Sequence, residues 1–168
     1  MRFQLSGMVN DSIVDGPGLR LAVFMQGCPY RCPGCHNPQT HDVSGGQTAD
    51  TQDVLAKLKS NPLLDGLTLS GGEPLVQPQA AAVMAEQARG LGLNVWCYTG
   101  STFEEIIKKK DEAVNRLLSL LSVLVDGPFI EAQKSLDVAW RGSSNQRLID
   151  VPASLKQGKT VLWQPESR

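Results

Sequence analysis

Three cysteines stand close together in the sequence and are the residues best suited to chemistry. Cys28, Cys32 and Cys35 fall within a stretch of eight residues, whereas Cys97 stands far away. Disulfide frameworks are typical of small chains in oxidising compartments, and the first residues lack the apolar segment of a secretory signal. The cysteine trio therefore predicts a metal or redox site rather than a disulfide scaffold.

The number of cysteines narrows the kind of metal site. A closed structural zinc site takes four ligands, and a four-iron cluster usually takes four cysteines. Three thiolates leave one iron of such a cluster with an open position, which admits an exogenous ligand. On spacing alone, a structural zinc site completed by His36 or His41 remains the alternative.

Composition excludes several classes of protein. The 168 residues predict one domain spanning 1–168, at about 150 residues per domain. With 41% hydrophobic and 20% charged residues, the chain is not a disordered one. Sixteen Lys and Arg against 17 Asp and Glu exclude a strongly basic nucleic-acid binder, and no apolar run approaches the ~20 residues of a membrane helix. We expect a cytoplasmic protein that binds neither nucleic acid nor membrane.

Strand and helix patterns alternate along the chain. Short apolar runs bounded by turn residues predict buried strands, and apolar residues at helical spacing predict the helices between them. A long loop and a tail of weaker pattern complete the chain. The predicted strands are 21–25, 66–70, 93–98 and 122–126, with weaker ones at 147–151 and 160–163; the helices are 51–60, 78–89 and 102–121, the last with a break at 108–112; the cluster-binding loop is 27–48 and the variable C-terminal tail is 127–168.

This alternation predicts an α/β fold with a parallel sheet. A closed eight-unit barrel typically needs about 250 residues, so we expect an open partial (βα) barrel, truncated relative to a full TIM barrel. Ligands bind at the carboxyl ends of parallel strands. The cysteine loop, the turn 71–74, Thr99 and Asp126 each follow a predicted strand, and we expect them to meet at one rim.

Two of these motifs resemble those of the radical S-adenosylmethionine superfamily. The spacing Cys28-x-x-x-Cys32-x-x-Cys35 is similar to its cluster loop, and Gly71-Gly72-Glu73-Pro74 resembles its second motif. The resemblance implies the partial barrel of that superfamily, a [4Fe–4S] cluster on the three cysteines, and S-adenosylmethionine on the open iron. It also implies that Gly71, Gly72, Glu73 and Pro74 hold the methionyl amino group of the cofactor.

Further motifs narrow the resemblance to activating enzymes of glycyl radical enzymes. The sequences Asp-Gly-Pro-Gly-Leu-Arg at 15–20, Gln-Gly-Cys at 26–28 and Cys-His-Asn-Pro at 35–38 resemble those activases. Trp-Arg-Gly-Ser-Ser-Asn-Gln at 140–146 resembles a motif of the activating proteins of anaerobic ribonucleoside-triphosphate reductases. The resemblance covers residues 11 to about 147.

That resemblance implies reductive cleavage of S-adenosylmethionine and hydrogen abstraction from a glycine Cα of a large glycyl radical reductase subunit. The electron would come from a low-potential donor such as flavodoxin or ferredoxin. Many superfamily members carry an aromatic residue before the third cysteine to pack on adenine; here that residue is Gly34. We further expect Tyr30, His36, Thr99 and Asp126 to bind the cofactor. Arg141, Asn145 and Gln146 are expected to bind the partner protein.

Three other functions stay open on the sequence. They are an activase of another glycyl radical enzyme such as pyruvate formate-lyase, a small-molecule radical enzyme such as a deazapurine synthase, and a zinc-stabilised binding module. Cys97 lies between two aromatic residues of a predicted strand and is expected to be buried and structural. Trp140 and Trp163 are expected to pack rather than to bind a ligand.

Overall fold

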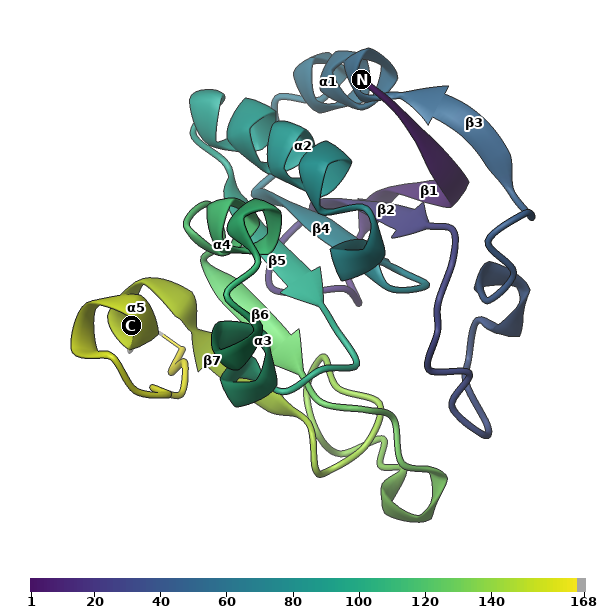
Figure 1. Ribbon diagram of the computed structural model, residues 1–168. Coiled ribbons are helices and arrows are strands. Elements are labelled where there is room, and N and C mark those ends of the chain that lie inside the picture. Colours follow the sequence, from purple (N-terminus) through teal and green to yellow (C-terminus); the bar gives the residue numbers. More distant parts are fainter. Residues whose placement is uncertain (166–168) are drawn as a thin grey trace.

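The computed structural model describes residues 1–165, which form a mixed α/β structure around one sheet (Figure 1). The sheet has seven strands in the order β3-β1-β2-β4-β5-β6-β7, and within residues 1–165 it is not closed into a barrel. The strands are β1 Arg2–Ser12, β2 Arg20–Met25, β3 Gln47–Asp50, β4 Gly66–Gly71, β5 Asn94–Tyr98, β6 Val123–Asp126 and β7 Arg147–Asp150.

The four central strands confirm the predicted parallel arrangement. β2 pairs with β4, β4 with β5, and β5 with β6, all in parallel. Each has the short apolar run expected of a strand that is buried on both faces. The helices that connect them are close to the predicted ranges. They are α1 Thr51–Ser60, α2 Pro78–Gly90, α3 Phe103–Lys109 and α4 Glu112–Leu118, with a further helix α5 Val151–Gln157 and short 3-10 turns η1 Pro38–Thr40, η2 Pro74–Val76 and η3 Glu131–Gln133.

The edges of the sheet differ from the expectation of a purely parallel sheet. β1 pairs in antiparallel fashion with β2 and β3, and β7 does so with β6. Antiparallel neighbours need no crossover helix, so the strand–helix alternation gave no sign of them. The predicted strand at 147–151 is confirmed as β7, whereas the one at 160–163 is wrong, because only Leu162 forms a bridge there, to Ile149.

Local capping explains the break that the sequence suggested between α3 and α4. Thr102 and Glu105 form a capping box that starts α3. Lys110 takes a left-handed conformation that ends it, and the Asp111 carboxylate accepts two backbone N–H groups to start α4. None of the helices in residues 1–165 combines the length and the apolar character that a membrane crossing needs.

The two faces of the sheet bury different sets of side chains. In Figure 1, α1, α2 and α4 lie over one face, and the large apolar core forms between them and the alternate strand residues that include Leu69 and Cys97. The opposite face carries Trp96, which packs edge-on against Trp140 and Trp163 at centroid distances of 5.3 and 5.2 Å. The expectations of a buried Cys97 and of packing roles for the two C-terminal tryptophans are confirmed.

Candidate functional site

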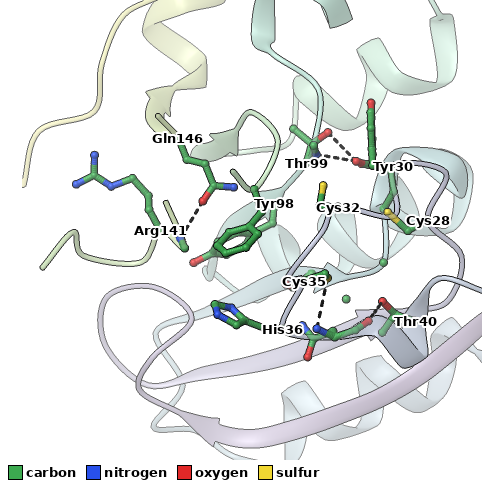
Figure 2. A pocket seen from close by; sticks show the side chains of 18 of the residues that line it. Cys28, Tyr30, Cys32, Cys35, His36, Thr40, Tyr98, Thr99, Arg141 and Gln146 are labelled. Carbon is green, nitrogen blue, oxygen red and sulfur yellow. Dashed lines mark hydrogen bonds between the residues drawn. The ribbon is translucent and has the colours of Figure 1, made fainter. Parts of the chain in front are cut away.

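A pocket of about 560 Å³ lies at the carboxyl ends of β2, β4 and β5 (Figure 2). Its volume is in the range of small-ligand sites, and its position is where parallel sheets bind ligands. All three cysteines of the trio line the pocket. The turn 71–74 and Thr99, which the sequence also placed at this rim, contribute lining residues, whereas Asp126 does not line it. The other predicted residues that line it are Tyr30, His36, Gly71, Gly72, Glu73, Thr99, Arg141 and Gln146.

The cysteine loop leaves β2 through a backbone ladder. Gly27 has a φ of 102°, and its N–H donates to the Thr40 carbonyl at 2.7 Å. The Cys28 N–H donates to the His41 carbonyl at 3.1 Å. Inside the loop, the Gln26 amide donates to the carbonyl oxygens of Gln39 and Asp42. The loop is thus held at its base by main-chain contacts and by the Gln26 amide, and of its three cysteine sulfurs the one of Cys35 accepts a hydrogen bond inside the loop, from the Asn37 N–H at 3.4 Å.

The three cysteines are partly exposed thiols without disulfide partners. Figure 2 shows their sulfur atoms gathered around one part of the pocket. Burial raises the pKa of the Cys28 thiol. No group of three or more His, Cys, Asp or Glu side chains within residues 1–165 is placed to hold a single metal ion. Three soft sulfur donors at one pocket are nevertheless the ligand type that iron–sulfur clusters use.

The Gly71-Gly72 turn lies directly against the cysteine loop. Gly71 has a φ of 97°, and a Cβ there would overlap the backbone of Met25. A Cβ on Gly72 would overlap the Gly27 carbonyl oxygen. Two hydrogen bonds of 2.8 Å join the segments, from Gly72 N–H to the Met25 carbonyl and from Glu73 N–H to the Gly27 carbonyl. Glycine is therefore required at both positions by close backbone approach.

Glu73 is buried with its carboxylate between two turns. It accepts hydrogen bonds from the Leu75 N–H at 3.1 Å, the Thr99 hydroxyl at 3.0 Å and the Gly100 N–H at 2.8 Å. Burial raises the pKa of this carboxyl. Pro74 opens η2 directly after it and is buried. The predicted pair Glu73 and Thr99 is thus brought together, with both residues bordering the pocket.

Tyr30 ties the cysteine loop to the turn after β5. Its hydroxyl is hydrogen-bonded to the Ser101 hydroxyl, and its ring lies so close to Gly100 that a Cβ there would be 2.7 Å from a ring carbon. Ser101 in turn donates its N–H to the Thr99 hydroxyl. A chain of hydrogen bonds therefore runs from Tyr30 to the Glu73 carboxylate.

Gly34, the residue before the third cysteine, has a φ of 75°, a conformation that favours glycine. Glu131 lies against Gly34, with a side-chain carbon 2.8 Å from where a Cβ would stand. His36 is exposed on one side and its ring lies 5.2 Å from that of Phe129. Phe129, Tyr98 and Trp140 add aromatic surface to the pocket. Sequence reasoning did not assign these three to the site; only the position of Tyr98 at the end of a predicted strand signalled it.

Asp126 lies apart from the pocket lining and has its partners within the protein. Its carboxylate accepts from the Phe103 N–H at 2.8 Å and pairs with the Arg147 guanidinium at 2.6 Å. Arg147 also pairs with Glu104 at 2.6 Å. This network joins β6, β7 and α3, so Asp126 is left out of the cofactor-binding set that we propose below.

The predicted partner-binding residues have different environments. Gln146 accepts from the Gly142 and Ser143 N–H groups and donates to the Gly127 carbonyl. The Asn145 amide donates to the Pro128 carbonyl at 2.8 Å. Both amides hold the backbone of their own segment. The Arg141 guanidinium instead extends away from the cysteines in Figure 2, with one bond to the Ala139 carbonyl.

The chain with this cysteine-lined pocket matches a known family model. Residues 14–149 match the model of a family described as the 4Fe-4S single cluster domain. This match defines the class of the protein as an iron–sulfur protein and supports an iron–sulfur cluster as its cofactor.

Curated relatives specify the family further. The chain is 38% identical over 143 residues to the anaerobic ribonucleoside-triphosphate reductase-activating protein of Salmonella typhi, covering 80% of this chain and 90% of that one. It is 36% identical to the proteins of the same name in Escherichia coli K12 and in Enterobacteria phage T4, covering 80% of this chain and 90% and 86% of theirs. The chain belongs to the family of anaerobic ribonucleoside-triphosphate reductase-activating proteins.

Proposed function

We propose that this protein is a radical S-adenosylmethionine enzyme that installs a glycyl radical on an anaerobic ribonucleoside-triphosphate reductase. The observation that carries the proposal is the meeting of the three cysteines and the Gly71-Gly72 turn at one pocket. The reductase is the substrate that the names of the relatives indicate. The four parallel strands are, in this proposal, the truncated (βα) barrel of the radical enzymes.

Cys28, Cys32 and Cys35 supply three thiolate ligands for a [4Fe–4S] cluster, which leaves one iron for S-adenosylmethionine. Their common loop and its place at the pocket fit that ligand set. When bound, the cluster supplies the electron that cleaves the sulfonium C–S bond, giving methionine and a 5′-deoxyadenosyl radical that removes a hydrogen atom from a glycine Cα of the reductase. The protein provides orientation and excludes water.

The chain's own residues position the cofactor. Gly71 and Gly72 line the pocket, and their missing side chains let the turn lie directly against the cysteine loop; in this proposal the turn holds the methionyl amino group. Glu73 adds negative charge beside that position and is itself held by Thr99 and Gly100. Tyr30 and His36 lie on the cysteine loop as candidates for contact with the nucleoside. Pro74 fixes the turn as the first residue of η2.

The partners follow from the same chemistry. The electron is taken from a low-potential donor such as flavodoxin or ferredoxin, and the hydrogen atom comes from the glycine of the large reductase subunit. A protein substrate must bring that glycine to the pocket, which is open between the cysteine loop and residues 127–146. Neither nucleic acid nor membrane is part of this proposal.

The test is an anaerobic assay on the reconstituted protein. Iron content, formation of 5′-deoxyadenosine and the electron spin resonance signal of a glycyl radical are measured with and without the reductase, next to the Cys32→Ala variant. We expect iron, cofactor cleavage and a radical that needs the reductase. A protein that binds zinc without iron, or that cleaves the cofactor but leaves the reductase without a radical, would contradict the proposal.

A further inference from the structure

Residues 133–144 form a hairpin that borders the pocket. Lys134 and Ser143 form an antiparallel bridge, and backbone hydrogen bonds run from Ser135 to Gly142 and from Ser144 to Gln133. This hairpin, called here the rim hairpin, occupies the segment between β6 and β7. Its sequence includes most of the Trp-Arg-Gly-Ser-Ser-Asn-Gln motif.

The rim hairpin is anchored at its base through Gln146 and in its turn through Trp140. Gln146 accepts from Gly142 and Ser143 and donates to Gly127. The Tyr98 hydroxyl donates to the Trp140 carbonyl at 2.6 Å, while the Trp140 ring packs on Trp96 and Trp163. Because the base is fixed in this way, ordering the hairpin adds little to the cost of binding a partner.

The tip of the rim hairpin presents two apolar side chains, Leu136 and Val138, on either side of the exposed Asp137. Leu136 is 94% exposed and yet lines the pocket, and Val138 lines it as well. A single exposed leucine is ordinary on a protein surface. Here, however, the exposed leucine borders the pocket that the cysteines line. An apolar side chain in that place contributes neither to the core nor to solubility, which is typical of an interaction site.

A further apolar residue lines the pocket from a second segment, the turn between β1 and β2. Val14 is 72% exposed and lines the same pocket. Its turn is held in place from below by the buried Arg20 guanidinium, which donates to the Pro17 carbonyl, and by the Thr68 hydroxyl, which donates to the Asp15 carbonyl. Two fixed segments, 122 positions apart in the sequence from Val14 to Leu136, therefore present apolar side chains at one opening.

We propose that Leu136 and Val14 form an apolar docking rim for the glycine-bearing segment of the reductase. This inference rests on the proposed function. A glycine Cα can lose its hydrogen atom in the pocket only if the polypeptide on either side of the glycine crosses the opening. Apolar side chains next to that glycine then cover Leu136 and Val14, as in the core of a protein–protein interface. An electron donor does not need to enter the pocket.

The test uses two leucines of similar exposure. Leu136→Asp removes the apolar tip, and Leu63→Asp is the matched control, because Leu63 is 75% exposed but lies before β4, at the amino end of the parallel strands. Binding of purified reductase to each reconstituted protein is measured by titration calorimetry, and iron content and thermal unfolding confirm that both variants are loaded and folded. We expect Leu136→Asp to bind at least about tenfold more weakly than wild type, since burying one leucine contributes more than the ~1.4 kcal/mol that tenfold represents. Leu63→Asp should bind within about twofold of wild type.

Other results would overturn the docking rim while leaving the proposed function in place. Equal binding by Leu136→Asp and wild type would do so. A second such result concerns the electron source. If Leu136→Asp forms no glycyl radical with flavodoxin as the electron donor but forms it with dithionite, the tip contacts the electron donor and not the reductase. A wild-type dimer that Leu136→Asp turns into a monomer would assign the tip to a second copy of this chain. Failure of the wild-type protein itself to bind the reductase would instead contradict the proposed function.

Discussion

The two segments that border the pocket, residues 27–46 and 127–146, are held to the sheet in different ways. The first is closed at its base by backbone bonds from Gly27 and Cys28 to Thr40 and His41, and its main chain contacts the Gly71-Gly72 turn. The side chains of Gln26 and Tyr30 hold the rest of it. The second is held by side chains, namely the amides of Asn145 and Gln146 and the stacked rings around Trp140.

This difference explains which residues are free for function. A loop closed by its main chain leaves its side chains available, so the cysteines of 27–46 can all serve as ligands. A segment closed by its side chains keeps few of them free. In 127–146 the free ones that border the pocket are at the hairpin tip, above all Leu136 and Arg141, and the polar motif residues Asn145 and Gln146 build the support instead.

The largest effect on cluster binding and activity is expected when a cysteine of the first segment is replaced. Cys32→Ala should lose iron and form no more 5′-deoxyadenosine than a sample without protein, because a three-ligand cluster site has no spare thiolate nearby. Cys97→Ala is the control and should keep its iron, since Cys97 is buried in the helix-covered core. Full cofactor cleavage by Cys32→Ala would show that our ligand assignment is wrong.

The backbone contact of the first segment should be almost as sensitive. Gly72→Ala forces the turn away from the Gly27 carbonyl, and we expect a loss of about 1–3 kcal/mol in the free energy of unfolding with weaker S-adenosylmethionine binding. Gly90→Ala is the matched control, because a Cβ there meets no atom within 4 Å. Chemical denaturation and cofactor titration measure both effects. Equal behaviour of the two variants would refute the importance of the close approach.

The side-chain support of the second segment should matter for stability but not for the cluster. Gln146→Leu removes three hydrogen bonds and should lower the free energy of unfolding by about 2 kcal/mol, with iron content retained. Gln133→Leu, which loses one exposed 3.3 Å bond, should cost less than about 0.5 kcal/mol. Loss of iron in Gln146→Leu would mean that the two segments are not held independently.

The smallest effect is expected at the ion pair next to the second segment. Hydrogen bonds from Arg147 lower the pKa of Glu104 from 4.5 to about 2. A lowered carboxyl pKa stabilises the fold above the unfolded value of 4.5, and this contribution is lost as the pH falls toward about 2. Because the Glu104 side chain is 57% exposed, it contributes less than about 1 kcal/mol.

Urea unfolding of wild type and Glu104→Gln from about pH 6 to about pH 3 checks this prediction. The advantage of wild type should shrink as the pH falls. A gap between the two proteins that stays constant over this range would show that Glu104 acts through packing rather than through its charge.

Much of the central fold could be predicted because its signals are local. The strand patterns at 21–25, 66–70, 93–98 and 122–126 identify all four parallel strands, and the capping residue Thr102 marks where α3 begins. β1 escaped prediction because it lies on the antiparallel side of the sheet, where a strand needs no crossover helix and leaves no strand–helix repeat.

The sequence by itself determined the chemistry available to this protein: the spacing of three thiols, the two glycines after a strand and the positions of the parallel strands along the chain are properties of neighbouring residues. Only the tertiary structure decided how the remaining polar residues are used. Asp126 pairs with Arg147, Gln146 supports a hairpin, and Leu136 stands at the pocket opening. The contacts from Asp126 to Arg147 and from Gln146 to Gly127 join residues about 20 positions apart in the chain. They arise only when β6 and β7 pair in the sheet.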